Sequence, residues 1–113
     1  MTPTSFDDFC LSLPGAAHEV LWGADNVFKV GGRMFAVRGT ATTCSFKANG
    51  VAFAMLVETG AARPAPYLAR AQWVYLDDLG SMPDKDLKAY LTQAHALVAA
   101  RLSRKARVAI GMA

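Results

Sequence analysis

Two adjacent glycines, Gly31-Gly32, lie between two short stretches in which apolar and polar side chains alternate. Glycine takes up positive φ angles without steric cost, and a pair of them between extended segments allows the tight turn of a β-hairpin. The pattern therefore predicts two antiparallel strands, over residues 27–30 and 33–38. Alternation at 17–22 and again at 42–47 predicts a strand on either side of this hairpin, so the first half of the chain forms an antiparallel meander.

Helical spacing of apolar residues marks three further segments, each with residues suited to a helix start at its N-terminal side. We expect helices at about 5–13, 51–58 and 83–103, and one more strand at 72–77. The predicted fold class is α+β, with an antiparallel β-sheet meander and helices packed on one face. One domain is expected, spanning residues 1–113.

The composition agrees with a folded domain, because 53% of the 113 residues are hydrophobic and 19% are charged. A chain with this much apolar surface can offset its conformational entropy on folding, which excludes the intrinsically disordered class. The longest apolar stretches, such as 51–57, are far shorter than the roughly 20 residues that cross a bilayer, and no signal segment opens the chain. We expect a cytoplasmic, monomeric protein without a membrane partner.

Few residues point to catalysis or metal binding. Cys10 and Cys44 form neither a disulfide framework nor a zinc pattern, and we expect two buried, reduced thiols. No cysteine or carboxylate near His18 or His95 has the spacing of a metal site, and neither Ser45 nor Cys44 lies in a nucleophile motif. The sequence thus predicts no metal, no cofactor and no catalytic residue, in a protein that is not an enzyme.

The basic residues are unevenly distributed, although the net charge is only +3. Four of the twelve lie in the last thirteen positions, which hold no acidic residue, and without them 8 basic residues face 9 acidic ones. A second stretch without a carboxylate lies between Asp25 and Glu58. The basic residues of these two regions are Lys29, Arg33, Arg38 and Lys47 in the meander and Arg101, Arg104, Lys105 and Arg107 near the C-terminus.

Strict alternation along the strands would place Lys29, Arg38 and Lys47 together on one side of the meander. The apolar residues of the same strands form the opposite set, which is Phe28, Val30, Phe35, Val37, Cys44 and Phe46. A face with one cation per strand can follow a phosphate backbone and bind it in a salt-dependent way. The alternative is an ordinary solvated sheet face, where cations discourage edge-to-edge aggregation. We expect Trp22 and Trp73 in the core rather than stacked on bases.

A series of short motifs follows along nearly the whole chain: Leu13-Pro14-Gly15-Ala16, Trp22-Gly23, Val27-Phe28-Lys29-Val30, Arg33-Met34-Phe35-Ala36, Pro66-Tyr67-Leu68, Trp73-Val74, and a last helix with Leu97-Val98 and Leu102. Jointly and in this order, they resemble the MmcQ/YjbR family of small bacterial proteins. The resemblance implies an α+β fold akin to that of the frataxin-like proteins. It also implies a "double wing" that binds DNA.

On this chain the wings implied by the resemblance would be the hairpin strands with the four basic residues of the meander. Short loops at Gly31-Gly32 and Gly39-Thr40 leave little protruding wing to enter a groove, so we expect contact with the DNA backbone rather than base readout. The iron chemistry of frataxin does not follow from a shared fold, because function resides in sites. Asp7, Asp8 and Glu19 are too few for an acidic, iron-donating ridge.

These observations predict a weakly sequence-specific, non-enzymatic DNA-binding domain whose candidate contacts are the eight basic residues named above. For the C-terminal cations, helix capping and solubility are an equally good explanation. The alternative function is a protein-interaction or adaptor domain, which docks an unknown partner through the 64–69 loop with Pro66, Tyr67 and Leu68. A small-molecule site is the third hypothesis, and the exposure of these residues distinguishes the three.

Overall fold

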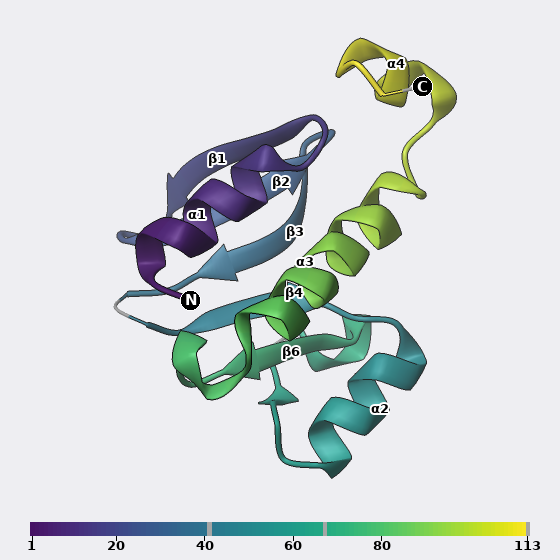
Figure 1. Ribbon diagram of the computed structural model, residues 1–113. Helices are drawn as coiled ribbons and strands as arrows, with labels where there is room; N and C mark the ends of the chain where they lie inside the picture. Colours follow the sequence, from purple (N-terminus) through teal and green to yellow (C-terminus); the bar gives the residue numbers. More distant parts are fainter. Residues whose placement is uncertain (41, 67, 113) are drawn as a thin grey trace.

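The computed structural model describes residues 1–40, 42–66 and 68–112 (Figure 1). Within these residues the centre is a six-stranded antiparallel sheet in the order β1-β2-β3-β4-β6-β5. The strands are β1 (Ala16–Leu21), β2 (Asp25–Val30), β3 (Arg33–Arg38), β4 (Cys44–Lys47), β5 (Arg63–Pro64) and β6 (Trp73–Leu76). The first four form the meander that the sequence predicts.

Helices α1 and α3 lie across one face of this sheet, and α2 packs at its β5–β6 end (Figure 1). The helices are α1 (Pro3–Ser12), α2 (Gly50–Glu58), α3 (Asp84–Ala99) and α4 (Arg104–Ala109), with 3-10 turns at Ala69–Ala71 and Leu79–Ser81. The predicted α+β class is confirmed. The opposite face, called the open face below, is partly covered by the loop that leads into β6.

The predicted hairpin is confirmed, with β2 and β3 joined by Gly31 and Gly32. Both glycines have positive φ angles, +58° and +79°. A Cβ atom at Gly31 would lie 2.5 Å from Leu102 Cδ1, beyond the end of α3. Both the positive φ angle and the closeness of Leu102 therefore exclude a larger residue at Gly31. The turn is thus a contact point for the C-terminal part of the chain.

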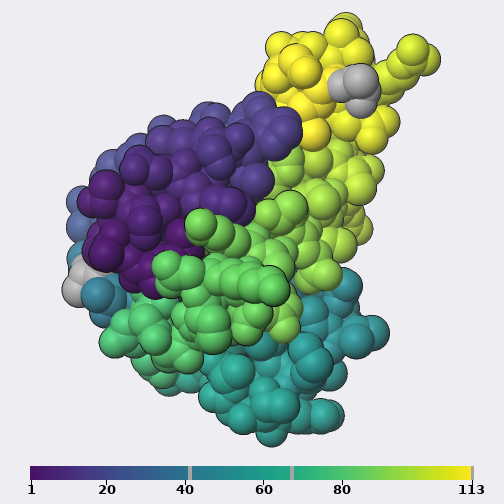
Figure 2. Space-filling view, viewed as in Figure 1, coloured from purple at the N-terminus to yellow at the C-terminus, as the bar shows by residue number. Residues whose placement is uncertain are grey.

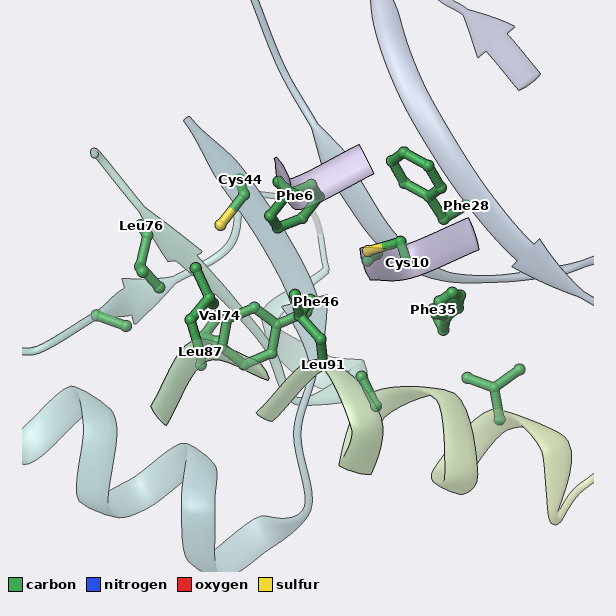
Figure 3. Packing of buried hydrophobic residues seen from close by; sticks show 14 of the residues in the cluster. Phe6, Cys10, Phe28, Phe35, Cys44, Phe46, Val74, Leu76, Leu87 and Leu91 are labelled. Carbon is green, nitrogen blue, oxygen red and sulfur yellow. The ribbon is translucent and has the colours of Figure 1, made fainter. Parts of the chain in front are cut away.

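One cluster of buried side chains fills the space between the sheet and the helices (Figure 3). It includes Phe6, Cys10, Phe28, Phe35, Cys44, Phe46, Val74, Leu76, Leu87 and Leu91. Cys10 and Cys44 are free, buried thiols, as predicted. Burial raises the pKa of Cys44 to about 12. Burial, and after it the charge of Asp7, also raises the pKa of Cys10.

Two helix boundaries differ from the prediction. Helix α1 begins at Pro3 rather than near residue 5, because Thr2 and Ser5 cap it by each accepting a hydrogen bond from the other's backbone N–H. Helix α3 ends at Ala99 rather than near residue 103. The chain turns there, and the hydroxyl of Ser103 caps the first turn of a separate helix, α4.

Helix α4 packs back onto the rest of the protein and forms the projection at one end of Figure 2. Ala106, Ile110 and Met112 are half-buried against the core cluster. Ile110 sits over Gly15, where an added Cβ would come within 2.9 Å of Ile110 Cδ1. The C-terminal segment up to Met112 is therefore a short packed helix with a following turn rather than a frayed tail.

Candidate functional site

Arg38 does not lie on the open face, because a β-bulge in β3 shifts the alternation of its side chains. The register between β2 and β3 changes after the Phe28–Ala36 pair, and Phe35 becomes an extra residue in β3. Phe35 and Ala36 are consecutive and both fully buried. Arg38 thus shares the helix-covered face with Cys44, its cross-strand partner on β4.

On the helix-covered face Arg38 forms a two-point ion pair with Asp7 of α1. The Arg38 Nε donates to Asp7 Oδ1 at 2.7 Å, and a terminal guanidinium nitrogen donates to Oδ2 at 2.8 Å. The two side chains are only 13% and 24% exposed, and the hydrogen bond to Asp7 raises the pKa of Arg38. The prediction that Lys29, Arg38 and Lys47 share one basic face is therefore wrong.

Lys29 does lie on the open face, but its charge is paired. Its ammonium group donates to the carboxylate of Glu19 on β1 at 2.7 Å. The Glu19 side chain is half exposed, and pairs of this kind contribute little to stability. The pair nevertheless offsets the one positive charge that β2 would offer to a phosphate.

Three of the other predicted cations come together at one end of the sheet. Arg33 at the start of β3, Lys47 at the end of β4 and Arg101 just after α3 line a hollow of about 280 Å³. Met34 and Val98 complete its walls, and among the described residues no carboxylate lines it. We call Arg33, Lys47 and Arg101 the basic end.

The electrostatics of the basic end are unfavourable in the free protein. Burial lowers the pKa of Lys47, and the nearby charge of Arg101 lowers it further. The Lys47 ammonium group is held in place by a hydrogen bond of 2.8 Å to the carbonyl of Ala71. Like charges held together without a counter-charge destabilise a fold, and a bound anion relieves that repulsion. The arrangement is therefore suited to an anionic ligand.

The remaining C-terminal cations fall into two groups. Arg104 and Lys105 are exposed in the first turn of α4, directly after the basic end in the sequence. Cations in the first turn oppose the helix dipole, so helix capping does not explain these two residues. Arg107 is half-buried, and its Nε is buried with no hydrogen-bond partner among the described residues. Packing rather than solvent thus surrounds part of the Arg107 side chain.

Trp22 was expected in the core, and that expectation is wrong. Strand β1 ends at Leu21, and Trp22 turns away with a φ angle of +51°, so the strand alternation no longer applies to it. Its side chain is 67% exposed. Trp73 on β6, by contrast, is buried as predicted.

Beside Trp22, the open face is hollowed to about 370 Å³. The lining residues are Trp22, Asp25, Met34, Val37, Ser45, Pro66 and Leu68. They come from four separate parts of the chain, and no local motif connects them. The sequence patterns therefore could not predict this hollow.

One wall of this hollow belongs to the loop that the sequence suggested as a protein-docking segment. Pro66 is exposed and Leu68 is half-buried, whereas Tyr67 lies outside the described residues. Two backbone hydrogen bonds anchor the loop to β6: the Ala65 N–H donates to the Trp73 carbonyl at 2.9 Å, and the Trp73 N–H donates to the Leu68 carbonyl at 3.2 Å. Partner docking through this loop stays a prediction.

The histidines make structural contacts. The buried His95 donates from Nε2 to the Pro14 carbonyl at 2.6 Å and meets the ring of Phe35 edge-on. His18 lies 2.8 Å from the Asn26 side-chain oxygen. In residues 1–40, 42–66 and 68–112 no three His, Cys, Asp or Glu side chains are grouped so that they could hold a metal ion.

Fold and surface together define a small α+β protein with one sheet, a helix-covered core and a cationic end. The YjbR family model matches residues 11–97, and the chain belongs to the YjbR family. The same fold occurs in the crystal structure of Deinococcus radiodurans protein DR2400, which has a DUF419 domain. That structure has a TM-score of 0.86 and 22% identity, covering 99% of this chain and 89% of that one.

At this identity the likeness to the Deinococcus protein shows a shared fold and nothing about a ligand. No curated protein matches the chain significantly. The helices in the described part of the chain are all too short or too polar to cross a membrane.

Proposed function

We propose that this YjbR protein is a non-enzymatic DNA-binding domain that contacts the phosphate backbone through the basic end, Arg33, Lys47 and Arg101. The observation that carries the proposal is the convergence of these three cations, from β3, β4 and the turn after α3, on one hollow that no carboxylate lines in the described part of the chain. Arg104 and Lys105 extend the same charge into the first turn of α4. Contacts of this kind position a protein on nucleic acid without reading its sequence.

Three of the eight predicted contacts are left out of the proposed site for physical reasons. Arg107 is half-buried, with its Nε inside the packing of the C-terminal segment. The positive charges of Arg38 and Lys29 are already paired with Asp7 and Glu19. A cation releases counterions from DNA only if its charge is available to a phosphate. The proposed contact is therefore an end of the molecule rather than a face of the sheet.

The compact hairpin argues for backbone contact over base readout. Only Gly31 and Gly32 separate β2 from β3, and Gly31 is packed against Leu102. Base readout in the major groove needs an element that enters a groove about 12 Å wide. The turn is too short and too tightly packed to serve as such an element, so we expect weak sequence preference.

The test is fluorescence anisotropy with a random-sequence DNA duplex, measured at several salt concentrations from about 20 mM upward. The variant is Arg33→Gln/Lys47→Gln/Arg101→Gln. We expect at least a tenfold loss of affinity at low salt. The slope of log K against log salt should fall by about 2–3, because each phosphate contact contributes about 0.9.

A matched control shows whether a loss of affinity comes from the basic end itself or only from the lower net charge of the protein. The variant Arg63→Gln/Lys85→Gln/Lys88→Gln also loses three positive charges. Arg63 is exposed on the edge strand β5, and Lys85 and Lys88 lie in the first half of α3, roughly 20 Å along the helix from Arg101. It should lose less than threefold in affinity. Equal losses in both triple variants, or no binding by the wild type at low salt, would contradict the proposal.

A further inference from the structure

The hollow beside Trp22 shares Met34 with the hollow of the basic end, but its polar and aromatic groups are different ones. Its volume of about 370 Å³ continues into a second hollow of about 220 Å³. The two share Asp25, Val37 and Ser45, so they form one groove across the open face, from Trp22 toward Tyr75. A groove of this size is in the range of small-molecule sites.

Trp22 is held beside this groove at an energetic cost. Its φ angle of +51° lies in the left-handed region, which is sterically unfavourable for a residue with a bulky side chain. The turn also keeps a large apolar ring 67% exposed to water. An aromatic ring at the mouth of an apolar groove offers its face to a ligand.

Asp25 supplies the polar group of the groove. It and Asp7 are both half-buried, and Asp7 satisfies its charge with the two-point pair to Arg38. Among the described residues nothing forms a hydrogen bond or ion pair with the Asp25 carboxylate. The carboxylate therefore has no partner in the described part of the protein, and a cation brought into the groove would pair with it.

We propose that this groove binds a small organic cation, an amine or quaternary ammonium carried on an apolar body. The ammonium group lies between the face of Trp22 and the carboxylate of Asp25, where cation–π attraction and charge pairing act together. The apolar body packs against Met34, Val37 and Leu68. This function is independent of DNA binding, because none of these polar groups belongs to the basic end.

The test is a titration of the wild-type protein with phenethylammonium, followed by two-dimensional ¹H–¹⁵N NMR. We expect chemical-shift changes at the Trp22 indole N–H and at the backbone amides of Asp25, Val37, Ser45 and Leu68. Neutral 2-phenylethanol has the same ring and chain, so it isolates the charge; it should bind at least fivefold more weakly. Shifts that spread over the whole surface, or equal binding of the two probes, would overturn the proposal.

Two variants and a control assign the binding to the groove. Asp25→Asn removes the charge while it keeps the shape, and Trp22→Ala removes the ring; each should weaken phenethylammonium binding at least fivefold. Asp86→Asn removes an exposed carboxylate on α3 and should change nothing. The folded state of each variant is checked by its NMR spectrum. The proposal would also be overturned by unchanged binding in a folded Asp25→Asn protein. The same holds if about 5 mM phenethylammonium causes no chemical-shift change at the groove residues of the wild type.

Discussion

The two ends of β3 carry the same side chain in different surroundings. Arg38, at the C-terminal end, is 13% exposed and held by both oxygens of Asp7. Arg33, at the N-terminal end, is exposed beside two further cations, Lys47 and Arg101. The first arginine is part of the fold, because it ties α1 to the sheet. The second lines a hollow to which the described residues contribute no carboxylate.

The difference shows that counting charges along a chain does not locate a binding site. Sequence places Arg33 and Arg38 in the same carboxylate-free stretch and offers no reason to separate them. The carboxylate that neutralises Arg38 comes from residue 7, 31 positions away. What distinguishes a structural cation from an available one is therefore its partner in space.

The largest expected effect is at the structural end of β3. Asp7→Ala leaves the Arg38 guanidinium partly buried without its counter-charge, which should lower the free energy of unfolding by about 2–4 kcal/mol. Urea denaturation followed by circular dichroism measures the change. A loss below about 0.5 kcal/mol would place this pair with ordinary surface ion pairs.

A double variant sharpens the interpretation of that loss. In Asp7→Leu/Arg38→Met both charges are replaced by apolar side chains of similar length, so no charge is left buried alone. Most of the lost stability should return, because the penalty comes from the orphaned charge more than from the lost attraction. If the double variant is as unstable as Asp7→Ala, the pair itself stabilises the fold.

The second effect concerns the interior beneath Arg38, where its β4 partner Cys44 is buried. Burial raises the pKa of Cys44 from 9.0 to about 12, and it also raises that of Cys10. In the unfolded chain each thiol ionises near pH 9, whereas in the folded protein it stays neutral. Its contribution to stability is therefore complete below pH 9 and is lost as the pH rises toward the folded pKa.

At pH 10 this loss should be about 1.4 kcal/mol for each thiol relative to pH 8. Urea denaturation at both pH values, with reductant present, measures it. The control is Cys44→Ala: its stability at pH 8 is lower because of the lost volume, but its decline between pH 8 and 10 should be shallower. An equal decline in wild type and variant would mean that Cys44 ionises in the folded state near its ordinary pKa.

The parts of the fold that sequence predicts are those set by local chemistry. The Gly31-Gly32 turn, the helix expected at about 51–58 and the buried Trp73 depend on residues close in the chain or on unbroken alternation. The α+β class follows from the order of such elements. These predictions were confirmed because each has a physical cause within a few residues.

The errors come from places where alternation breaks or where distant segments meet. One extra residue, Phe35, reverses the parity of β3 and moves Arg38 to the other face. Nothing in the local pattern marks this bulge, because Phe35 and Ala36 are both apolar. Trp22 is misplaced for a related reason, since β1 ends one residue before it. The basic end needs the C-terminus of α3 beside β3 and β4, a contact that only tertiary packing supplies.

The smallest effect is expected at the other end of β3, and it has the opposite sign. Arg101→Gln removes a charge that repels Lys47, so the protein should become more stable by about 0.3–0.5 kcal/mol at low salt. At about 0.5 M salt, where the Debye length is close to 4 Å, the gain should disappear. The Lys47 pKa, followed by NMR of its side chain, should rise in the variant. A loss of stability at both salt concentrations would instead make Arg101 a structural residue like Arg38, and the distinction between the two ends of β3 would fail.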